Sequence, residues 1–310
     1  MSEVEETAIE EKPGGPEETL AEEELAEHEE IEESRPEETE EPGSEEATEL
    51  EIQKAPELSY FKLRIACAKE LANLLRAVAV LADEPTIMFT EDGLRMCSID
   101  SSRVAMVDLF VGRSVFDEYE AEDGSKICVS LPGLLRLLRR AKKGETAELA
   151  LDEATGRVRL TLRGNYMRSF TIPRLEFVET APPELKLALT ARAFLDAREL
   201  RKAVEEVGLI GDFVKLTVDN GGLTLDAESD ISSAKIEFSR ACNAMIDLEV
   251  KTPAAATYDA DCLAKLLKAG TALADIVEVK LATDKPLKLE FRLPYEAMLV
   301  YWLAPRVDVE

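Results

Sequence analysis

One stretch of the sequence, LPGLLRLLRRAKK at residues 131–143, carries a pattern from which the fold can be worked out. Arg136, Arg139, Arg140 and Lys143 are spaced at i, i+3, i+4 and i+7, so a helix over 132–143 would bring them onto one face. The leucines fall on the opposite face, and no acidic residue interrupts the stretch. The pattern predicts a helix that packs on a sheet through its leucines and leaves a basic face uncovered.

The sequence around this helix reads as one unit written twice. In the first copy we expect a strand, a helix and a hairpin at 61–66, 69–81, 86–90 and 94–99. In the second copy we expect the same series at 185–189, 196–207, 213–218 and 223–227. Both hairpin connectors, EDG at 91–93 and DNGG at 219–222, contain the Asp/Asn-Gly pairs that accept positive φ in tight turns.

The second part of each unit also matches. A strand, a helix and three further strands are expected at 127–131, 132–143, 147–151, 157–162 and 167–172. Their counterparts are expected at 256–259, 260–269, 276–281, 287–293 and 298–303. The strands alternate apolar and polar residues, which is typical of sheets with one buried face. The fold class is therefore α+β, with two similar domains of antiparallel sheet, each backed by two helices, at 58–172 and 187–310 and joined by a Pro-rich connector at 173–186.

The other helices carry basic residues as well. Arg198, Arg201 and Lys202 repeat the i, i+3, i+4 spacing, Lys265 and Lys268 lie three apart, and Arg76 lies on the weakest of the four. One basic stripe is usually a solvated surface, but four of them, each opposite a sheet-packing face, favour contact with phosphate backbones. No aromatic residues alternate with the bases, so we expect duplex DNA rather than a single strand.

The net charge of −27 is concentrated in the N-terminal segment. Residues 1–57 contain 24 Glu and three basic residues, which leaves 40 acidic and 34 basic residues for positions 58–310. The segment has too few apolar residues to offset its ordering entropy, so we expect a disordered acidic extension. Three interpretations remain open: a solvating tail, an upstream start site, or a regulatory element that mimics DNA phosphate. We expect its removal to leave folding unchanged.

Several classes of protein are disfavoured. The one histidine, His28, lies in the acidic segment, and the five cysteines are scattered without a C-x-x-C pair. Glu91, Asp92 and Asp219 fall in turns, where turn chemistry explains them. We therefore expect no catalytic site, no metal and no cofactor. No apolar run of 18 residues occurs, so we expect no membrane span, and a cytoplasmic, nucleoid-associated location.

Three separated motifs carry a family resemblance. They are TEDGL at 90–94 followed by IDSSRVAMVDL at 99–109, DKPLKLEF at 284–291, and WLAPRV at 302–307. The chain resembles the proliferating cell nuclear antigen (PCNA) family over 58–310, in particular its archaeal members. The resemblance implies a ring of three subunits with helices lining the hole, acting as a replicative sliding clamp on duplex DNA. Arg136, Arg139 and Lys268 match channel positions that are basic in the family. A checkpoint-type clamp, or a scaffold subunit of a heterotrimeric ring, is the alternative.

The resemblance also implies partners. Family members recruit DNA polymerase, flap endonuclease and DNA ligase through peptides that place aromatic anchors in an apolar pocket, and a separate clamp loader, replication factor C, opens the ring. Carried over to this sequence, the pocket comprises Ile99, Val104, Met106, Phe177, Val178, Pro182, Pro286, Trp302, Ala304 and Pro305.

Ring closure in the family joins two edge strands, which correspond here to 163–170 and 233–238. The implied interface residues are Arg163, Tyr166, Arg168, Phe170, Ala234, Ile236 and Phe238. Unpaired strand edges favour such pairing. The sequence leaves open whether the ring is a homotrimer or a heterotrimer with sister subunits.

Overall fold

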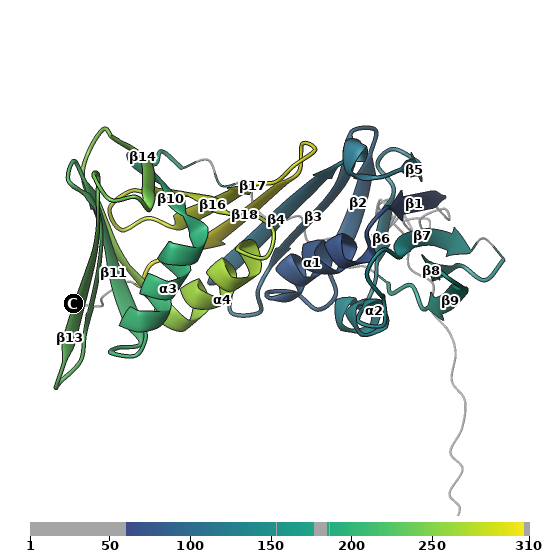
Figure 1. Cartoon of the computed structure of the whole chain (residues 1–310), viewed down its shortest axis with the longest axis horizontal. Helices are drawn as coiled ribbons and strands as arrows, with labels where there is room; N and C mark the ends of the chain where they lie inside the picture. Colours follow the sequence, from purple (N-terminus) through teal and green to yellow (C-terminus); the bar gives the residue numbers. More distant parts are fainter. Residues whose placement is uncertain (1–59, 153, 177–184, 186, 307–310) are drawn as a thin grey trace, which may run out of the picture. The chain divides into compact units, whose positions relative to one another are not determined.

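The computed structural model describes residues 60–152, 154–176, 185 and 187–306 (Figure 1). The chain divides into two compact units at Gln53/Lys54, and all described elements belong to the second unit. The predictions for the acidic segment 1–57, and for Phe177, Val178 and Pro182 in the connector, lie outside the described residues.

The described residues form two successive series of elements of the same kind. The first series is β1 Phe61–Ile65, α1 Ala68–Ala79, β2 Thr86–Thr90, β3 Gly93–Ile99, β4 Ala105–Gly112, η1 Arg113–Val115, β5 Glu118–Ala121, β6 Lys126–Cys128, α2 Leu131–Leu138, β7 Thr146–Asp152, β8 Arg157–Arg163 and β9 Met167–Ile172. The second is β10 Ala191–Asp196, α3 Ala197–Val207, β11 Phe213–Asp219, β12 Gly222–Glu228, β13 Ser233–Ser239, β14 Met245–Val250, β15 Ala254–Asp259, α4 Ala260–Gly270, β16 Ile276–Leu281, β17 Leu287–Arg292 and β18 Met298–Leu303.

Strand pairing repeats along with the element order. The first series forms the sheet β5-β1-β7-β8-β9, and the second forms the equivalent order β14-β10-β16-β17-β18. The order β13-β12-β11-β15 likewise repeats β4-β3-β2-β6. Every pairing is antiparallel. The predicted α+β class and the internal duplication are confirmed.

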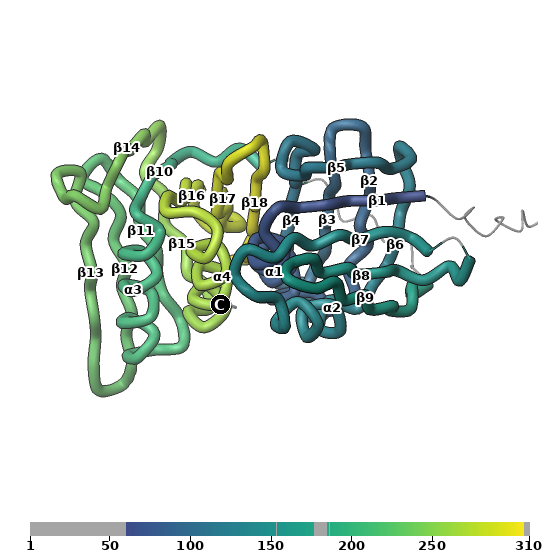
Figure 2. The backbone as a smooth tube through the Cα atoms, turned by 45° about the vertical axis from the view of Figure 1, so that its right-hand side comes forward, coloured from purple at the N-terminus to yellow at the C-terminus, as the bar shows by residue number. Residues whose placement is uncertain are grey.

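One strand pair joins the two halves. The last strand, β18, pairs antiparallel with β4, from Met298 opposite Phe110 to Leu303 opposite Ala105. This contact merges two sheets into the nine-stranded order β14-β10-β16-β17-β18-β4-β3-β2-β6. In Figure 2 the yellow β18 lies beside the blue β4.

The four helices follow one another in the order α3, α4, α1, α2, with contacts between each neighbouring pair (Figure 1). Each helix buries its apolar residues against strands, as the leucine-rich face predicts; α1, for example, contacts β4 and β7. Polar N-caps begin three of the helices: the side chains of Ser130, Asp196 and Asp259 accept backbone N–H groups of the first turn.

The strand expected at 185–189 is wrong. The described residues there, 185 and 187–189, form no strand, and β10 begins at Ala191 instead. Both segments alternate apolar residues, but β10 has strand partners on both sides, β14 and β16. Partner pairing, which the alternation alone does not reveal, decides between them. The prediction also left out β5 and β14, and gave β4 only as part of a motif.

The helix expected over 132–143 is too long. It ends at Leu138, where Arg139 forms the C-cap. The N–H groups of Arg140 and Ala141 donate to carbonyls three residues back, which tightens the last turn. The Glu145 carboxylate then accepts the Lys142 N–H at 2.7 Å, and Gly144 takes a positive φ of 82°. The single helical face of four bases is therefore a wrong expectation, because Arg140 and Lys143 follow the helix.

Candidate nucleic-acid interface and partner pocket

Basic side chains from all four helices surround one hollow. The hollow has a volume of about 870 Å³ and lies where α1 and α2 meet α3 and α4. Its basic lining residues are Arg76, Arg136, Arg139, Arg198, Arg201, Lys265 and Lys268. Asp83 is the one acidic residue in the same lining. Seven of the ten bases predicted to contact DNA thus come together, whereas Arg140, Lys143 and Lys202 do not line the hollow.

Three bases of the hollow, Arg198, Arg201 and Lys265, make ion pairs at the surface. Arg198 lies 2.7 Å from Asp275, and Lys265 lies 3.4 Å from Asp261. All four of these side chains are largely exposed, and such pairs contribute little to stability, so phosphate oxygens can replace them. Within the described part of the chain, Arg136 and Lys268 make no ion pair. The arrangement suits sequence-independent contact with a phosphate backbone.

Three of the predicted pocket residues form one row across neighbouring strands. Ile99 of β3 lies opposite Met106 of β4, and Met106 lies opposite Trp302 of β18. The row continues to Lys288 of β17, whose Nζ lies 5.5 Å from the centre of the Trp302 ring. Directly opposed residues share a face of the sheet, so the row forms a continuous apolar strip with a cation at its end.

Asp100 builds the loop that borders this row. Its carboxylate accepts backbone N–H groups from Ser102, Val104 and Ala105. Burial alone would raise the pKa of Asp100, but these bonds and the Ser102 hydroxyl more than offset it and lower the pKa. The loop holds Arg103 at a φ of 58° and leaves Val104 40% exposed.

The C-terminal segment borders the row at the same strand ends as this loop. The N–H of Ala304 donates to the Val104 carbonyl at 2.8 Å, which brings Ala304 and Pro305 beside the loop. Leu287 pairs with Leu303, so the preceding Pro286 lies at this end of the sheet as well. The structure therefore gathers the described members of the predicted pocket in the row and at the strand ends that border it. Nothing in the sequence indicated that Lys288 lies beside Trp302, because only the pairing of β17 with β18 brings the two residues together.

The two strands predicted to form the subunit interface are both edge strands. β9 ends one sheet and β13 ends another. On and before β9, Arg163 pairs with Glu148, Arg168 pairs with Glu145, and the Tyr166 ring lies under Lys142 and Arg168. Of the remaining predicted members, Phe170, Ala234 and Ile236 are half-buried and Phe238 is buried.

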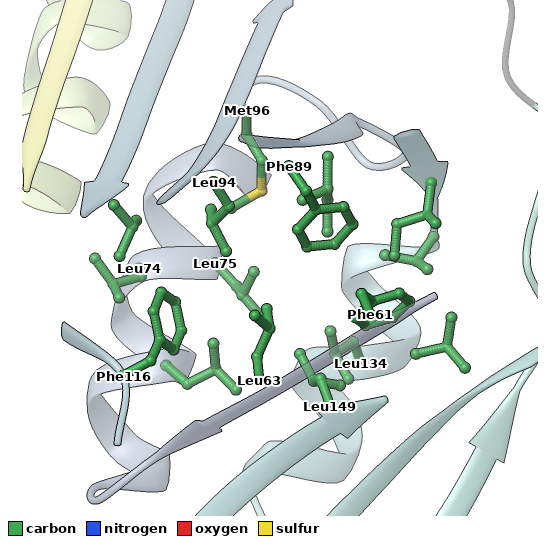
Figure 3. Close-up of a pocket in the computed structure, with 16 residues that line it drawn as sticks. Phe61, Leu63, Leu74, Leu75, Phe89, Leu94, Met96, Phe116, Leu134 and Leu149 are labelled. Atoms are coloured by element: carbon green, nitrogen blue, oxygen red, sulfur yellow. The ribbon is translucent and has the colours of Figure 1, made fainter. Parts of the chain in front are cut away.

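Other parts of the described structure offer no catalytic constellation. The core of the first half encloses a cavity of about 20 Å³, lined only by apolar side chains such as those in Figure 3. A dry cavity of this size holds no ligand. Mainly because the two thiols are buried, the pKa of Cys97 is raised to about 12 and that of Cys262 to about 11. Neither thiol is therefore a ready nucleophile.

The described residues contain neither a metal cluster nor a membrane-spanning helix. No group of three or more His, Cys, Asp or Glu residues there is arranged to hold a metal ion. No described helix combines the length and apolarity that crossing a membrane requires.

The chain matches known proteins over nearly all its described part. The model of the proliferating cell nuclear antigen N-terminal domain matches residues 60–177, and that of the C-terminal domain matches residues 188–306. DNA polymerase sliding clamp 1 of Pyrobaculum aerophilum is 32% identical over 241 residues, which are 78% of this chain and 96% of the relative. The DNA polymerase sliding clamp of Thermofilum pendens is 30% identical over 241 residues, 78% of this chain and 97% of the relative.

Solved structures agree with these matches. The PCNA2–PCNA3 complex from Sulfolobus tokodaii aligns with a TM-score of 0.73 at 28% identity, covering 79% of this chain and 99% of that one. PCNA from Thermococcus kodakaraensis aligns with a TM-score of 0.74 at 26% identity, covering 79% and 100%. The resemblance seen in the three sequence motifs is confirmed: the chain belongs to the proliferating cell nuclear antigen family.

Proposed function

We propose that the chain is a subunit of a replicative DNA sliding clamp, a trimeric ring that encircles duplex DNA and acts as a processivity factor. One observation supports the proposal most directly: seven basic residues from the four helices line a single hollow, and the helices pack against the sheets on their other side. Contacts made by charge alone hold the duplex without reading bases, so a ring lined in this way can move along DNA.

The row of Ile99, Met106 and Trp302 is the proposed docking site for partners. A peptide with an aromatic anchor would cover the exposed part of this apolar strip and the Val104 loop beside it. DNA polymerase is the first partner, as in the relatives named DNA polymerase sliding clamps. Flap endonuclease, DNA ligase and the clamp loader replication factor C are proposed to use the same site. The chain itself would carry out no catalysis.

The ring is proposed to close through its edge strands. Within the chain, β18 pairs with β4, and the equivalent strands of the repeat are β9 and β13. A β9 to β13 contact between copies would repeat the internal joint, making the two domains at 58–172 and 187–310 quasi-equivalent around the ring. A heterologous contact of this kind gives a closed ring when the rotation that relates neighbouring subunits is a whole fraction of a full turn. No observation favours the alternative of a checkpoint-type clamp.

Charge reversal tests the proposal. The variant with Arg136→Glu, Arg139→Glu and Lys268→Glu keeps β9 and β13 intact, so it should keep the oligomeric mass of the unmodified chain. We expect it to lose stimulation of polymerase processivity on primed circular DNA. Lys251→Glu, an exposed base on the loop before β15, is the matched control. Unchanged processivity in the triple variant would contradict the channel assignment.

A further inference from the structure

The row that contains Trp302 continues beyond Lys288. Lys288 of β17 lies opposite Lys280 of β16, and Lys280 lies opposite Arg192 of β10. Directly opposed residues of antiparallel strands share one face of a sheet, so the three bases extend the apolar strip on the same face. We call Lys288, Lys280 and Arg192 the cationic ladder. The face of the nine-stranded sheet thus changes from apolar to basic at Trp302.

Two buried carboxylates order the lysines of the ladder. Glu290 of β17 and Glu278 of β16 lie opposite each other in the neighbouring row, and only 8% and 2% of their side chains are exposed. Lys288 and Lys280 each donate a hydrogen bond of 3.0 Å to Glu290. Lys280 also lies 3.1 Å from Glu278. Buried carboxylates require cationic partners, and here the more exposed ammonium groups lie over the acids that they neutralise.

The same network has an excess of positive charge. Arg292 lies 3.2 Å from Glu278 and 3.5 Å from Glu290, and its side chain is largely exposed. Arg192 lies 3.9 Å from Glu278 and pairs with Glu249 at the far end of the ladder, where both side chains are exposed. Four bases therefore face three acids in this network of described residues, and two of the acids are buried. An anion that approaches from solvent meets ammonium and guanidinium groups first.

The ladder begins at the residue on which the proposed docking site depends. The Nζ atom of Lys288 lies 5.5 Å from the centre of the Trp302 ring. A peptide whose aromatic side chain covers the apolar strip therefore has its neighbouring residues within reach of Lys288. Adjacent strands lie about 4.8 Å apart, and an extended chain advances about 3.3 Å per residue. The residues within about four positions of the aromatic anchor would therefore span the ladder from Lys288 to Arg192.

We propose that the cationic ladder binds a run of acidic residues beside the aromatic anchor of a partner peptide, and that Lys288 selects the first of these acids. The inference rests on the proposed docking site and names the chemistry of the partner segment that this site prefers. A basic segment in the same place would meet like charge at all three bases of the ladder. The ladder therefore discriminates between partners that share the same anchor.

A peptide series tests the ladder without altering the chain. All peptides have the same aromatic anchor, with three glutamates, three glutamines or three lysines placed either before it or after it. In fluorescence anisotropy at low salt, one of the two glutamate peptides should bind about tenfold more tightly than its glutamine counterpart, and the lysine peptide should bind more weakly than both. The preference should disappear near about 1 M salt, where the Debye length is about 3 Å. Equal affinities of the glutamate and glutamine peptides in both placements would overturn the inference.

The variant Lys288→Met tests the role of this one base. It keeps an apolar stem beside Trp302 and leaves Glu290 paired with Lys280, so the fold should be retained, which circular dichroism checks. The variant should lose most of the preference for the glutamate peptide and bind the glutamine peptide as the unmodified chain does. Lys251→Met, an exposed base on the loop before β15, is the matched control and should keep the full preference. A full preference in Lys288→Met would contradict the role of Lys288.

Failure of the ladder can be told apart from failure of the docking site. Trp302→Ala should weaken the binding of every peptide in the series, whatever its flanking residues. Peptides that bind Trp302→Ala as tightly as the unmodified chain would contradict the docking site in the proposed function. Peptides that require Trp302 but bind independently of their flanking charges would contradict the ladder alone.

Discussion

The hydroxyl of Tyr301 donates a hydrogen bond to the carbonyl of Ala77 at 2.7 Å, and both residues are fully buried. Ala77 lies in the last turn of α1, where helix carbonyls lack partners within the helix. Tyr301 lies on β18, and its ring meets the Phe291 ring edge-on, with 6.2 Å between the ring centres. Burial raises the pKa of Tyr301, so the hydroxyl stays protonated and remains a donor. One side chain thus ties the helix of the first half to the sheet of the second.

Tyr301→Phe should destabilise the chain by about 1 to 3 kcal/mol, because the buried Ala77 carbonyl loses the hydroxyl that donates to it. Urea unfolding of both proteins at equal chain concentration measures the difference. Tyr295→Phe removes a hydroxyl from a tyrosine that is 69% exposed and should change little. Equal losses from the two substitutions would contradict the structural role of the Tyr301 hydroxyl.

Trp302→Ala should weaken the binding of an aromatic-anchored partner peptide by about 2 kcal/mol, roughly 30-fold. The indole lies beside Met106 and under Lys288, so its loss removes the centre of the apolar strip. Fluorescence anisotropy of a labelled peptide gives the affinity.

Tyr295→Ala provides the matched control for peptide binding, since this aromatic residue lies in the turn between β17 and β18, away from Val104. Its affinity should equal that of the unmodified chain. An unchanged affinity in Trp302→Ala would refute the pocket assignment.

The Glu290 carboxylate should make the free energy of unfolding depend on pH in the acidic range. Burial by itself would raise its pKa, but hydrogen bonds from Lys280 and Lys288 outweigh it and lower the pKa to about 2, from an ordinary 4.5. A carboxyl group with a depressed pKa stabilises the fold above its unfolded pKa and loses that contribution as pH falls through the folded value. Glu290→Gln should therefore cost more at pH 7 than near pH 2, by urea unfolding. A cost independent of pH would contradict the ionic role.

Substitutions in the hollow should change the salt dependence of DNA binding. Arg136→Ala should reduce the slope of log K against log salt concentration by about 0.9 for each phosphate contact removed. The loss of affinity should be the same for different duplex sequences, because these contacts read no bases. Lys251→Ala should leave the slope unchanged, and a loss confined to one duplex sequence would argue for base reading instead.

Most of the architecture could be predicted because it depends on local patterns. Strands β9, β16 and β18 fall at their predicted bounds, and the Asp/Asn-Gly turns lie between the expected hairpin strands. The failures have a common cause. The segment 185–189 alternates as well as β10 does, and α2 has no local stop signal before Gly144. In both places a partner distant in sequence takes part in the outcome: β10 pairs with β14 and β16, and the Arg168 guanidinium donates to the Arg140 carbonyl just beyond the end of α2.

The candidate site was predictable to a similar extent. Helix spacing alone brought Arg198, Arg201, Lys265 and Lys268 to the hollow, because α3 and α4 keep the expected lengths. The same spacing placed Arg140 on the helix, but α2 ends at Leu138, two residues before Arg140.

Topological retention on DNA tests the central claim most directly. The chain, labelled with a fluorophore, is loaded by a clamp loader and ATP onto a singly nicked circular duplex and washed at high salt. We predict that it stays with the circle and is released when one restriction enzyme linearises the DNA. Loss from the intact circle at high salt, or retention after linearisation, would contradict a ring that encircles the duplex.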